Sequence, residues 1–432
     1  MLAITDHSEQ RLALAVERFG RLKPDRLEFI RQDFERLARE RSRQEFCDRM
    51  KGIFAQQFRD EILDSLVTGE DLEHSLPGEY ARGVSHRGSA HTAVLAAGEN
   101  ESLETIARIL TFGLLWFDHL RTSGGFGATL FGLRLILPAS GVRKVAHSCA
   151  ALAPSLGVRL FSLDPRLDTL EESNVSQAGN IDSRLVPHRE FKDLLDRAHP
   201  AVAPIVALAP RCITLHPGQS RSVVLRFRGL PFAAWENSEL FFLHGDSRQT
   251  IRGDVIAFLS AKLHELELHR HPLASDTRHP LYRAQPELWL EALVRDDVMR
   301  IDACLDPRFV YTQIFSNAAG SHGILHVLSV TRSGRLAIVE FEASELIHLP
   351  LQASEDCLRI RRHQRQGDFP RYGYFPGLAL QAAPPLLYLV APALRFHPTT
   401  DILLRYLTRD LDVVRVGLLE SWRRGRRVVQ RQ

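Results

Sequence analysis

The chain has 432 residues, of which 44% are hydrophobic and 25% are charged, the proportions of a folded globular protein that is too long for one ordinary domain. A net charge of +3 excludes a chain-wide basic field as the basis of nucleic-acid binding. The longest apolar runs, Ile109–Phe117 and Leu386–Leu394, are too short to cross a membrane, and the first residues lack a signal-peptide pattern. The five cysteines are far apart and form no CxxC pair, which argues against a zinc cage or a disulfide framework. We therefore expect a cytoplasmic protein without a membrane partner.

The first residues of the chain carry a helical pattern. Leu27, Ile30, Phe34 and Leu37 recur at helical spacing with charged residues between them. This spacing predicts a helical segment over about residues 8–66.

The next hundred residues alternate between strand and helix patterns. The expected strands are Thr92–Ala97, Gly132–Pro138 and Val158–Asp164, and the expected helices are Ser102–Arg121 and Val142–Ala153. Such alternation predicts an α/β layer with at least some parallel strand pairing.

The middle of the chain has a different composition. Ala198–Pro210 is rich in proline and alanine and is interpreted as a connector. Alternating apolar residues and turn residues over Cys212–Ser247 predict β-hairpins, and a helix is expected over Thr250–His269.

The last 150 or so residues again alternate, in the order α-β-β-β-α-β-α-β. The expected elements are the helix Gln285–Ile301, the strands Phe309–Phe315, Gly323–Thr331 and Gly334–Ala343, the helix Leu349–Arg362, the strand Pro385–Phe396, the helix Thr399–Thr408 and the strand Asp412–Leu419.

The two α/β blocks share a layout. Aligning Thr92–Ala97 on Leu336–Phe341 brings the later strands of both blocks into step and places Ala96 where the second block has Glu340. One interpretation is an ancient duplication whose first copy has lost its acid. The alternative is that any two α/β segments can be matched to this extent.

These patterns predict an α/β protein in four parts. Residues 1–70 are expected to be helical, 71–197 to form an α/β domain that is a candidate degenerate repeat, 198–275 to form a β-hairpin-rich connector with a helix, and 276–432 to form a second α/β domain.

Two acids end a predicted buried strand in the last part. Glu340 and Glu342 flank Phe341, and period-two geometry places both acids on one face. Buried carboxylates are costly unless they bind a cation or are fully hydrogen bonded, which favours a functional site. The alternative is that one of the pair faces solvent at the strand end.

The C-terminal segment resembles a known enzyme superfamily. The helix with "LWLEALV", the hairpin, "LAIVEFEAS" and "LPLQ" at the start of a helix, over about residues 280–418, are similar to the PD-(D/E)XK nucleases, most of all to the branch related to bacterial and archaeal mismatch-type endonucleases. The resemblance implies a restriction-endonuclease-like α-β-β-β-α-β core. It also implies phosphodiester hydrolysis assisted by Mg²⁺ or Mn²⁺.

The resemblance also assigns catalytic residues. Glu340 matches the second acid of the motif, Glu342 lies at the position of the usual lysine, and Gln352 matches a glutamine that supports the site. Asp356 replaces the tyrosine that often follows this glutamine.

The metal ligands implied by the resemblance come from three elements. They are Glu340, Glu342, Glu291 on the first helix and His326, which stands where the family has its first aspartate; Glu287 is the second choice for the helix acid.

Two departures from the motif bear on activity. Histidine at position 326 removes an anionic ligand. Glu342 replaces the usual lysine, and because no lysine follows Lys262 in the chain, no other lysine of this segment can take its place. The expected function is therefore metal-dependent nucleic-acid hydrolysis or a catalytically impaired derivative of it. The alternative is a non-catalytic binding or scaffold protein that keeps the nuclease fold. DNA is the expected partner, with RNA as an alternative and a homodimer left open.

Two arginine-rich segments could contact phosphates. Arg365–Gly377 mixes arginine with aromatic residues, and Trp422–Gln432 carries five arginines. A packed loop and a solvated tail are the alternatives.

Overall fold

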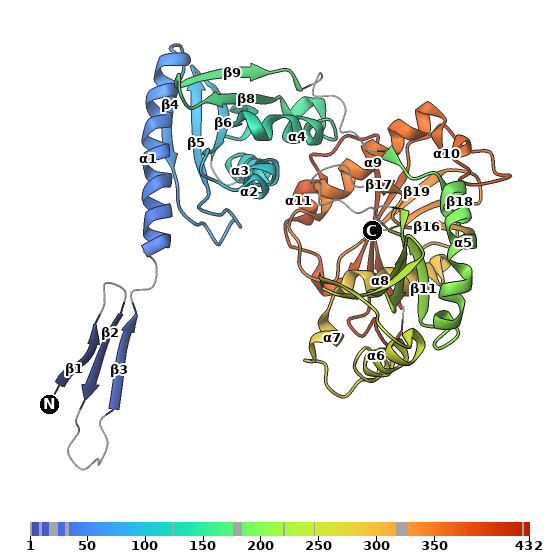
Figure 1. Cartoon of the computed structure of the whole chain (residues 1–432). Helices are drawn as coiled ribbons and strands as arrows, with labels where there is room; N and C mark the ends of the chain where they lie inside the picture. Colours follow the sequence, from blue (N-terminus) through green and yellow to red (C-terminus); the bar gives the residue numbers. More distant parts are fainter. Residues whose placement is uncertain are drawn as a thin grey trace. The chain divides into compact units, whose positions relative to one another are not determined.

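The computed structural model describes residues 2–7, 11–16, 25–30, 34–122, 125–175, 184–218, 221–245, 247–316, 327–425 and 427–432. The chain divides into two compact units, one formed by Met1–Val142 and Arg159–Ser173 and the other by Arg143–Val158 and Asn174–Gln432. Both are built from helices and mixed β-sheets, so the α/β class is confirmed (Figure 1). Within the described ranges, no helix is both long and apolar enough to cross a membrane.

The predicted N-terminal helix is only partly correct. Helix α1 spans Phe34–Gln57. The residues before it form a three-stranded antiparallel sheet of β1 (Leu2–His7), β2 (Arg11–Val16) and β3 (Asp25–Ile30). In β3, Leu27 and Phe29 alternate with charged neighbours, which is the period of two of a strand. Leu27 and Ile30 also fit a helical spacing, and the prediction followed that second pattern.

The main sheet of the first unit has six strands in the order β4-β5-β6-β7-β8-β9. The pairs β4–β5, β5–β6 and β8–β9 are antiparallel, and β6–β7 is parallel. The strands are β4 (Ile62–Val67), β5 (Tyr80–Arg87), β6 (Ala90–Ala97), β7 (Leu130–Pro138), β8 (Val158–Asp164) and β9 (Thr169–Ser173). Helices α2 (Leu103–Ala107) and α3 (Ile109–Thr122) connect β6 to β7, and α4 (Ala139–Cys149) connects β7 to β8.

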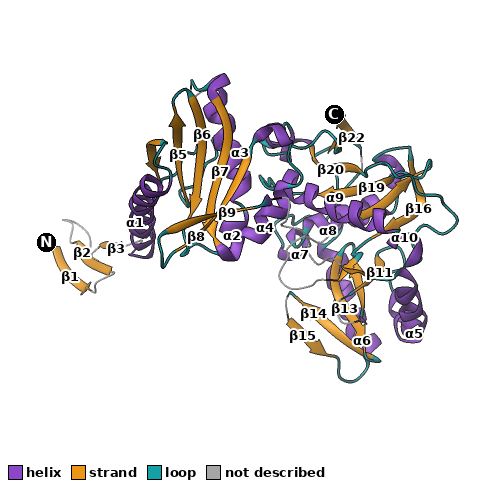
Figure 2. Ribbon diagram, turned by 90° about the horizontal axis from the view of Figure 1, so that it is seen from above, coloured by secondary structure: helices purple, strands orange, loops and turns teal. Residues whose placement is uncertain are grey.

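Helices lie on both faces of this sheet (Figure 2). Helix α1 covers one face, where Phe54 belongs to the same buried cluster as Ile136 of β7. Helix α3 lies against β6 and β7, and its Gly113 permits a close approach because a Cβ there would be 2.8 Å from Leu135.

The second unit contains another six-stranded sheet, in the order β16-β18-β19-β20-β21-β22. Its pairs are antiparallel, antiparallel, parallel, parallel and antiparallel in that order. The strands are β16 (Leu305–Tyr311), β18 (Val327–Thr331), β19 (Leu336–Phe341), β20 (Leu386–Pro392), β21 (Asp412–Leu418) and β22 (Val428–Arg431).

Two helices frame β19 and β20. Helix α8 (Pro286–Arg295) shares a buried core with Val339 and Phe341, whereas α9 (Leu349–Gln366) contacts β19 and β20. Because residues alternate along a strand, Glu340 points to the face opposite the α8 core. The remaining helices near this sheet are α10 (Asp368–Arg371) and α11 (Thr400–Leu404).

The two six-stranded sheets therefore have the same strand order and, at every pair whose direction is described in both, the same direction. The residue-by-residue pairing of the two sheets can be compared because β7 and β20 both end in proline, at Pro138 and Pro392. Ala96 pairs with Ile136, and Phe341 pairs with Val390, and each partner lies two residues before that proline. Ala96 thus corresponds to Phe341.

The expected equivalence of Ala96 and Glu340 is consequently wrong by one residue. Glu340 pairs with Leu389, and the matching pair in the first unit is Leu95 with Leu135. Leu95 has no exposed surface, so the counterpart of the acid is a core residue.

An antiparallel meander lies between the two α/β parts of the sequence. Its strands, in sheet order, are β11 (Ile213–Pro217), β12 (Val223–Phe227), β13 (Leu230–Glu236), β14 (Glu239–His244) and β15 (Ser247–Thr250). It packs with α6 (Val255–His269), which confirms the predicted hairpins and helix.

The expected connector at Ala198–Pro210 is instead the second half of a helix. Helix α5 spans His188–Val206 and contains Pro200 and Pro204. Its buried residues are Leu194, Ala198, Val202 and Ile205, at spacings of four, four and three. Packing of this apolar stripe on the meander outweighs the cost of the two prolines.

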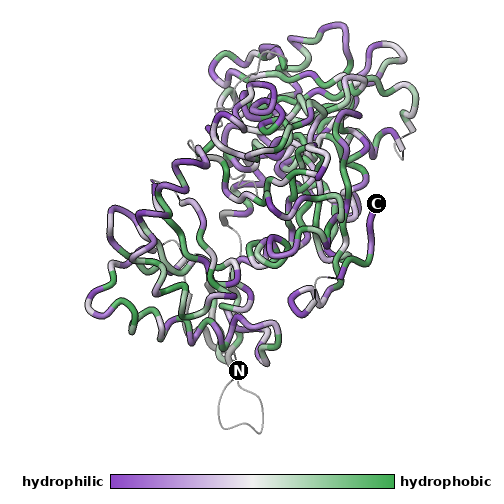
Figure 3. The backbone as a smooth tube through the Cα atoms, turned by 90° about the vertical axis from the view of Figure 1, so that its right-hand side faces the viewer, coloured by the Kyte–Doolittle hydropathy of each residue, from purple (hydrophilic) through white to green (hydrophobic). Residues whose placement is uncertain are grey.

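The chain ends in a hydrophilic segment (Figure 3). This segment is not a free tail, because residues 428–431 form β22 beside β21. Before it, Trp422 is buried and the Arg423 guanidinium lies 5.1 Å from the Trp289 ring. These contacts give the predicted tail a structural role.

Candidate site at the end of strand β19

Strand β19 occupies an interior position of its sheet and is buried along its whole length. Glu340 is the last residue but one of the strand, and Glu342 directly follows its last residue, Phe341. Both side chains are buried, with only 5% of each residue exposed. Two carboxylates are thus held inside the protein where the sequence predicts a site.

Glu340 faces the middle of helix α9. Cys357 of this helix is completely buried, and burial raises the pKa of its thiol well above the usual value. The charges of Asp356 and Glu340 raise that pKa further, which places both carboxylates near this cysteine. Glu340 therefore belongs to a polar group beneath α9.

Glu342 has different neighbours. Its Oε1 accepts hydrogen bonds from the backbone N–H of Ser344 at 2.9 Å and from the Ser344 hydroxyl at 2.6 Å. The same hydroxyl lies 3.4 Å from Oε1 of Glu287, in the first turn of α8. The N–H of Glu342 donates to the carbonyl of Val390 at 3.0 Å, so pairing with β20 continues past Phe341, and the expectation that both acids share one face stays a prediction.

Glu291, the predicted acid of the first helix, lies in an ion pair. Arg226 of β12 lies 3.3 Å from its Oε1, and both side chains are almost fully buried. Burial lowers the pKa of Arg226, and the Glu291 carboxylate opposes this effect. The meander thus supplies a cation at the position where the resemblance implies a metal ligand.

Of the other two predicted residues, only Gln352 lies within the described part of the chain. Gln352 is exposed in the first turn of α9, and Glu340 is near residues one turn further along. His326 lies outside the described residues. Among the residues that are described, Glu340, Glu342 and Glu291 do not form a set of three ligands with all donor atoms within 4.8 Å.

The arginines that could replace the missing lysine have partners of their own. Arg359 forms an ion pair of 2.9 Å with Asp356 under α9. Arg335 forms one of 2.5 Å with Asp412 and donates to the carbonyl of Pro384 at 2.7 Å. Both guanidinium groups therefore neutralise protein charges.

Further titratable groups surround Arg359 in the second unit. The Ser148 hydroxyl donates to Glu355, and burial of Glu355 raises the pKa of its carboxyl above the usual value. Burial, assisted by the charges of Arg359 and Arg362, lowers the pKa of His147 to about 4. Burial is therefore the main cause of the shifted pKa values of Glu355 and His147.

The aromatic residues of the loop Arg365–Gly377 are mostly internal. Phe369, Tyr374 and Phe375 are buried, and the Tyr374 ring lies 4.9 Å from the Tyr311 ring. This favours the packed-loop interpretation over base stacking by these three rings.

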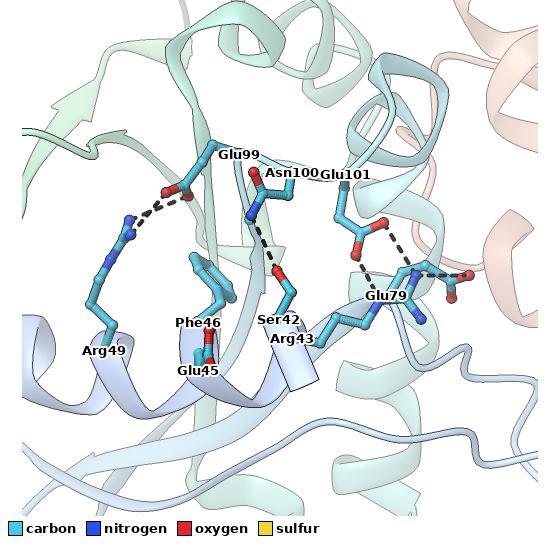
Figure 4. A pocket seen from close by; sticks show the side chains of 10 residues that line it. Ser42, Arg43, Glu45, Phe46, Arg49, Glu79, Glu99, Asn100 and Glu101 are labelled. Carbon is cyan, nitrogen blue, oxygen red and sulfur yellow. Dashed lines mark hydrogen bonds and ion pairs between the residues drawn. The ribbon is translucent and has the colours of Figure 1, made fainter. Parts of the chain in front are cut away.

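The first unit has a pocket beyond the end of β6, the counterpart of β19 (Figure 4). It has a volume of about 290 Å³, and arginines of α1 pair with acids that follow the strand. Arg43 lies 2.7 Å from Glu101, and Arg49 lies 2.8 Å from Glu99. These ion pairs make the pocket a neutralised surface.

Sequence reasoning also missed a cluster on the same sheet. Asp64, His86 and His91 each offer a ligand atom, and these atoms lie within 4.8 Å of one another. A signal was present in "HRGSAH", since a Gly-containing turn between two histidines places them opposite each other in a hairpin.

Comparison with known proteins does not assign a family to this chain. No protein-family model matches it, and no curated protein matches it.

Proposed function

We propose that this protein acts on nucleic acid by binding, and that its C-terminal part is a PD-(D/E)XK nuclease-like domain with impaired metal-dependent hydrolysis. The pairing of Glu291 with Arg226 carries this proposal. The guanidinium of Arg226 competes with a divalent ion for the carboxylate of Glu291. Because the guanidinium is part of the chain, it is always present beside this carboxylate, whereas an ion must bind from solution.

The order and direction of the elements support the nuclease-like fold. Helix α8 is followed by the antiparallel strands β16, β18 and β19, and then by α9 and the parallel strand β20. This order is α-β-β-β-α-β, the core that the sequence motif implies, and Glu340 lies at the end of its third strand.

The first unit supports an origin by duplication. It repeats the strand order and places α1 before the three strands, as α8 stands before β16. The acid position is occupied by Leu95. A first copy without an acid at the strand position and a second copy whose helix acid is paired with an arginine are both consistent with a fold kept for binding.

Hydrolysis is tested with supercoiled plasmid and with labelled single- and double-stranded DNA and RNA, in Mg²⁺ and in Mn²⁺. We expect no cleavage by the wild type above the level of a Glu340→Ala variant, which controls for contaminating nucleases. Cleavage that disappears in Glu340→Ala would overturn the impaired-site proposal and establish an active nuclease.

A gain-of-function variant tests the ancestry of the site. His326→Asp combined with Glu342→Lys restores the residue types of the motif. Mn²⁺-dependent cleavage by this double variant, abolished by adding Glu340→Ala, would support a decayed nuclease site.

Binding is measured separately by fluorescence anisotropy at several salt concentrations. We expect affinity that falls with salt, because arginine–phosphate contacts release counterions. The absence of binding to all of these nucleic acids at low salt would overturn the nucleic-acid proposal in favour of the scaffold alternative.

A further inference from the structure

Asp64, His86 and His91 come from three adjacent strands of the first unit. His86 of β5 and His91 of β6 are directly paired across the hairpin, with ring centroids 5.6 Å apart. Nδ1 of His86 lies 2.9 Å from Oδ2 of Asp64 on β4. Asp64 is exposed and the two histidines are half-buried, so the cluster is open to solvent.

A β-bulge directs Asp64 to this cluster. Leu63 pairs with Ser85, and Ser65 pairs with Val84, so Asp64 is the extra residue between them. Leu63 packs against the core under α1. Alternation from Leu63 then turns Asp64 to the opposite face, which is the face of His86.

The hydrogen bonds of Thr129 favour one tautomer of His91. The single hydroxyl proton of Thr129 is donated to the carbonyl of Phe126 at 2.6 Å. Toward Nδ1 of His91, 3.0 Å away, Oγ1 can then only accept, so this nitrogen carries the proton. Nε2 of His91 is left with its lone pair, the arrangement found in metal-binding histidines with a supporting hydrogen bond.

We infer that Asp64, His86 and His91 form a binding site for a divalent transition-metal ion of the Zn²⁺ class. Two imidazoles and one carboxylate are the ligands that such ions take, and three protein ligands leave coordination positions for water or another ligand. Metal bonds of about 2.1 Å bring ligand atoms within about 4.2 Å of one another. Small rotations of the half-exposed side chains achieve this.

The site is independent of the nuclease proposal. It lies in the other unit, uses softer ligands than Mg²⁺ prefers, and involves neither Glu340 nor Glu342. Either proposal can fail without the other.

The test is titration of the metal-free full chain with Co²⁺, followed by visible absorption, and with Zn²⁺, followed by calorimetry. We expect one ion per chain, with Co²⁺ bands displaced by Zn²⁺. His91→Ala is expected to weaken Zn²⁺ binding at least tenfold, and Asp64→Asn to weaken it by a similar factor.

Two controls make the result specific. His244→Ala removes an exposed histidine of β14 in the other unit and should bind Zn²⁺ as the wild type does. Circular dichroism checks that each variant is folded, and His86→Gln replaces His91→Ala if the latter is not. Absence of saturable binding, or binding unchanged in the folded His86 and His91 variants, would overturn the inference.

Discussion

Arg226 and Glu291 form a buried ion pair between a strand of the meander and helix α8, with 3.3 Å between guanidinium and carboxylate and side chains that are 3% and 2% exposed. The pair ties the inserted meander to the helix that precedes the candidate nuclease core. It also explains how an acid expected to bind metal can be buried: its charge is balanced by the arginine.

Removing one member of this pair is expected to be costly. Arg226→Met leaves the Glu291 charge buried and should lower the free energy of unfolding by about 3 to 5 kcal/mol. Urea unfolding of the variant measures this change. The double variant with Glu291→Leu removes both charges of the pair and should recover most of the loss. A single variant as stable as the wild type would show that the pair does not hold the meander.

Replacing Glu355 should change how stability depends on pH. The folded-state pKa of this carboxyl is raised by burial, so its favourable contribution is present below its unfolded pKa and is lost as pH rises through the folded value. Glu355→Gln cannot ionise and keeps an acceptor for Ser148. We therefore expect the variant to gain stability relative to the wild type between about pH 4.5 and neutral pH, measured by chemical unfolding across this range. A difference that does not vary with pH would contradict this prediction.

His147 should act in the opposite direction. Its pKa is lowered from 6.5 to about 4, mainly by burial, so its neutral form stabilises the fold above pH 6.5 and this stabilisation is lost as pH falls towards 4. His147→Gln should remove that part of the acid sensitivity, so that the variant gains relative to the wild type on acidification. NMR titration of the histidine provides a direct check, and an ordinary imidazole pKa would disprove the assignment.

Two glycines with similar backbone angles provide a matched test of packing. Gly229, in the turn before β13, has φ +84°, and a Cβ there would lie 2.0 Å from the carbonyl oxygen of Leu288. Gly253 has φ +83° with no atom within 4 Å of its Cβ position. Gly229→Ala should cost about 3 kcal/mol or more, and Gly253→Ala about 1 kcal/mol, because only the first adds a backbone clash to the strain. Equal losses in thermal unfolding would refute the contact between this turn and α8.

The sequence was most informative where one pattern dominates. Short apolar runs identified β6, β7, β19 and β20, and these strands are found within a few residues of the expected positions. It was least informative for α5, where prolines outweighed the buried stripe in the prediction, and for β3, where both periods fit. In such segments tertiary packing decides between conformations that have similar local preferences.

Contacts between side chains from distant segments could not be predicted from local sequence patterns. Glu291 and Arg226 are 65 residues apart, and nothing in the spacing of either residue indicates the other. The Asp64 cluster depends on a bulge, which alternation alone does not reveal. The prediction that Glu340 and Glu342 are buried is confirmed. The residues that contact them could be identified only from the three-dimensional structure.

The bulge in β4 leaves Asp64 outside the pairing of the sheet, so this residue is not needed to join β4 to β5. Leu63 and Leu66 both pack toward α1 although they are three residues apart, and an unbroken strand would turn them to opposite faces. Deleting Asp64 would leave them two apart and would preserve every β4–β5 residue pair. The architecture could therefore be built from a shorter strand, and the one residue it does not require is the one that brings a carboxylate to the two histidines.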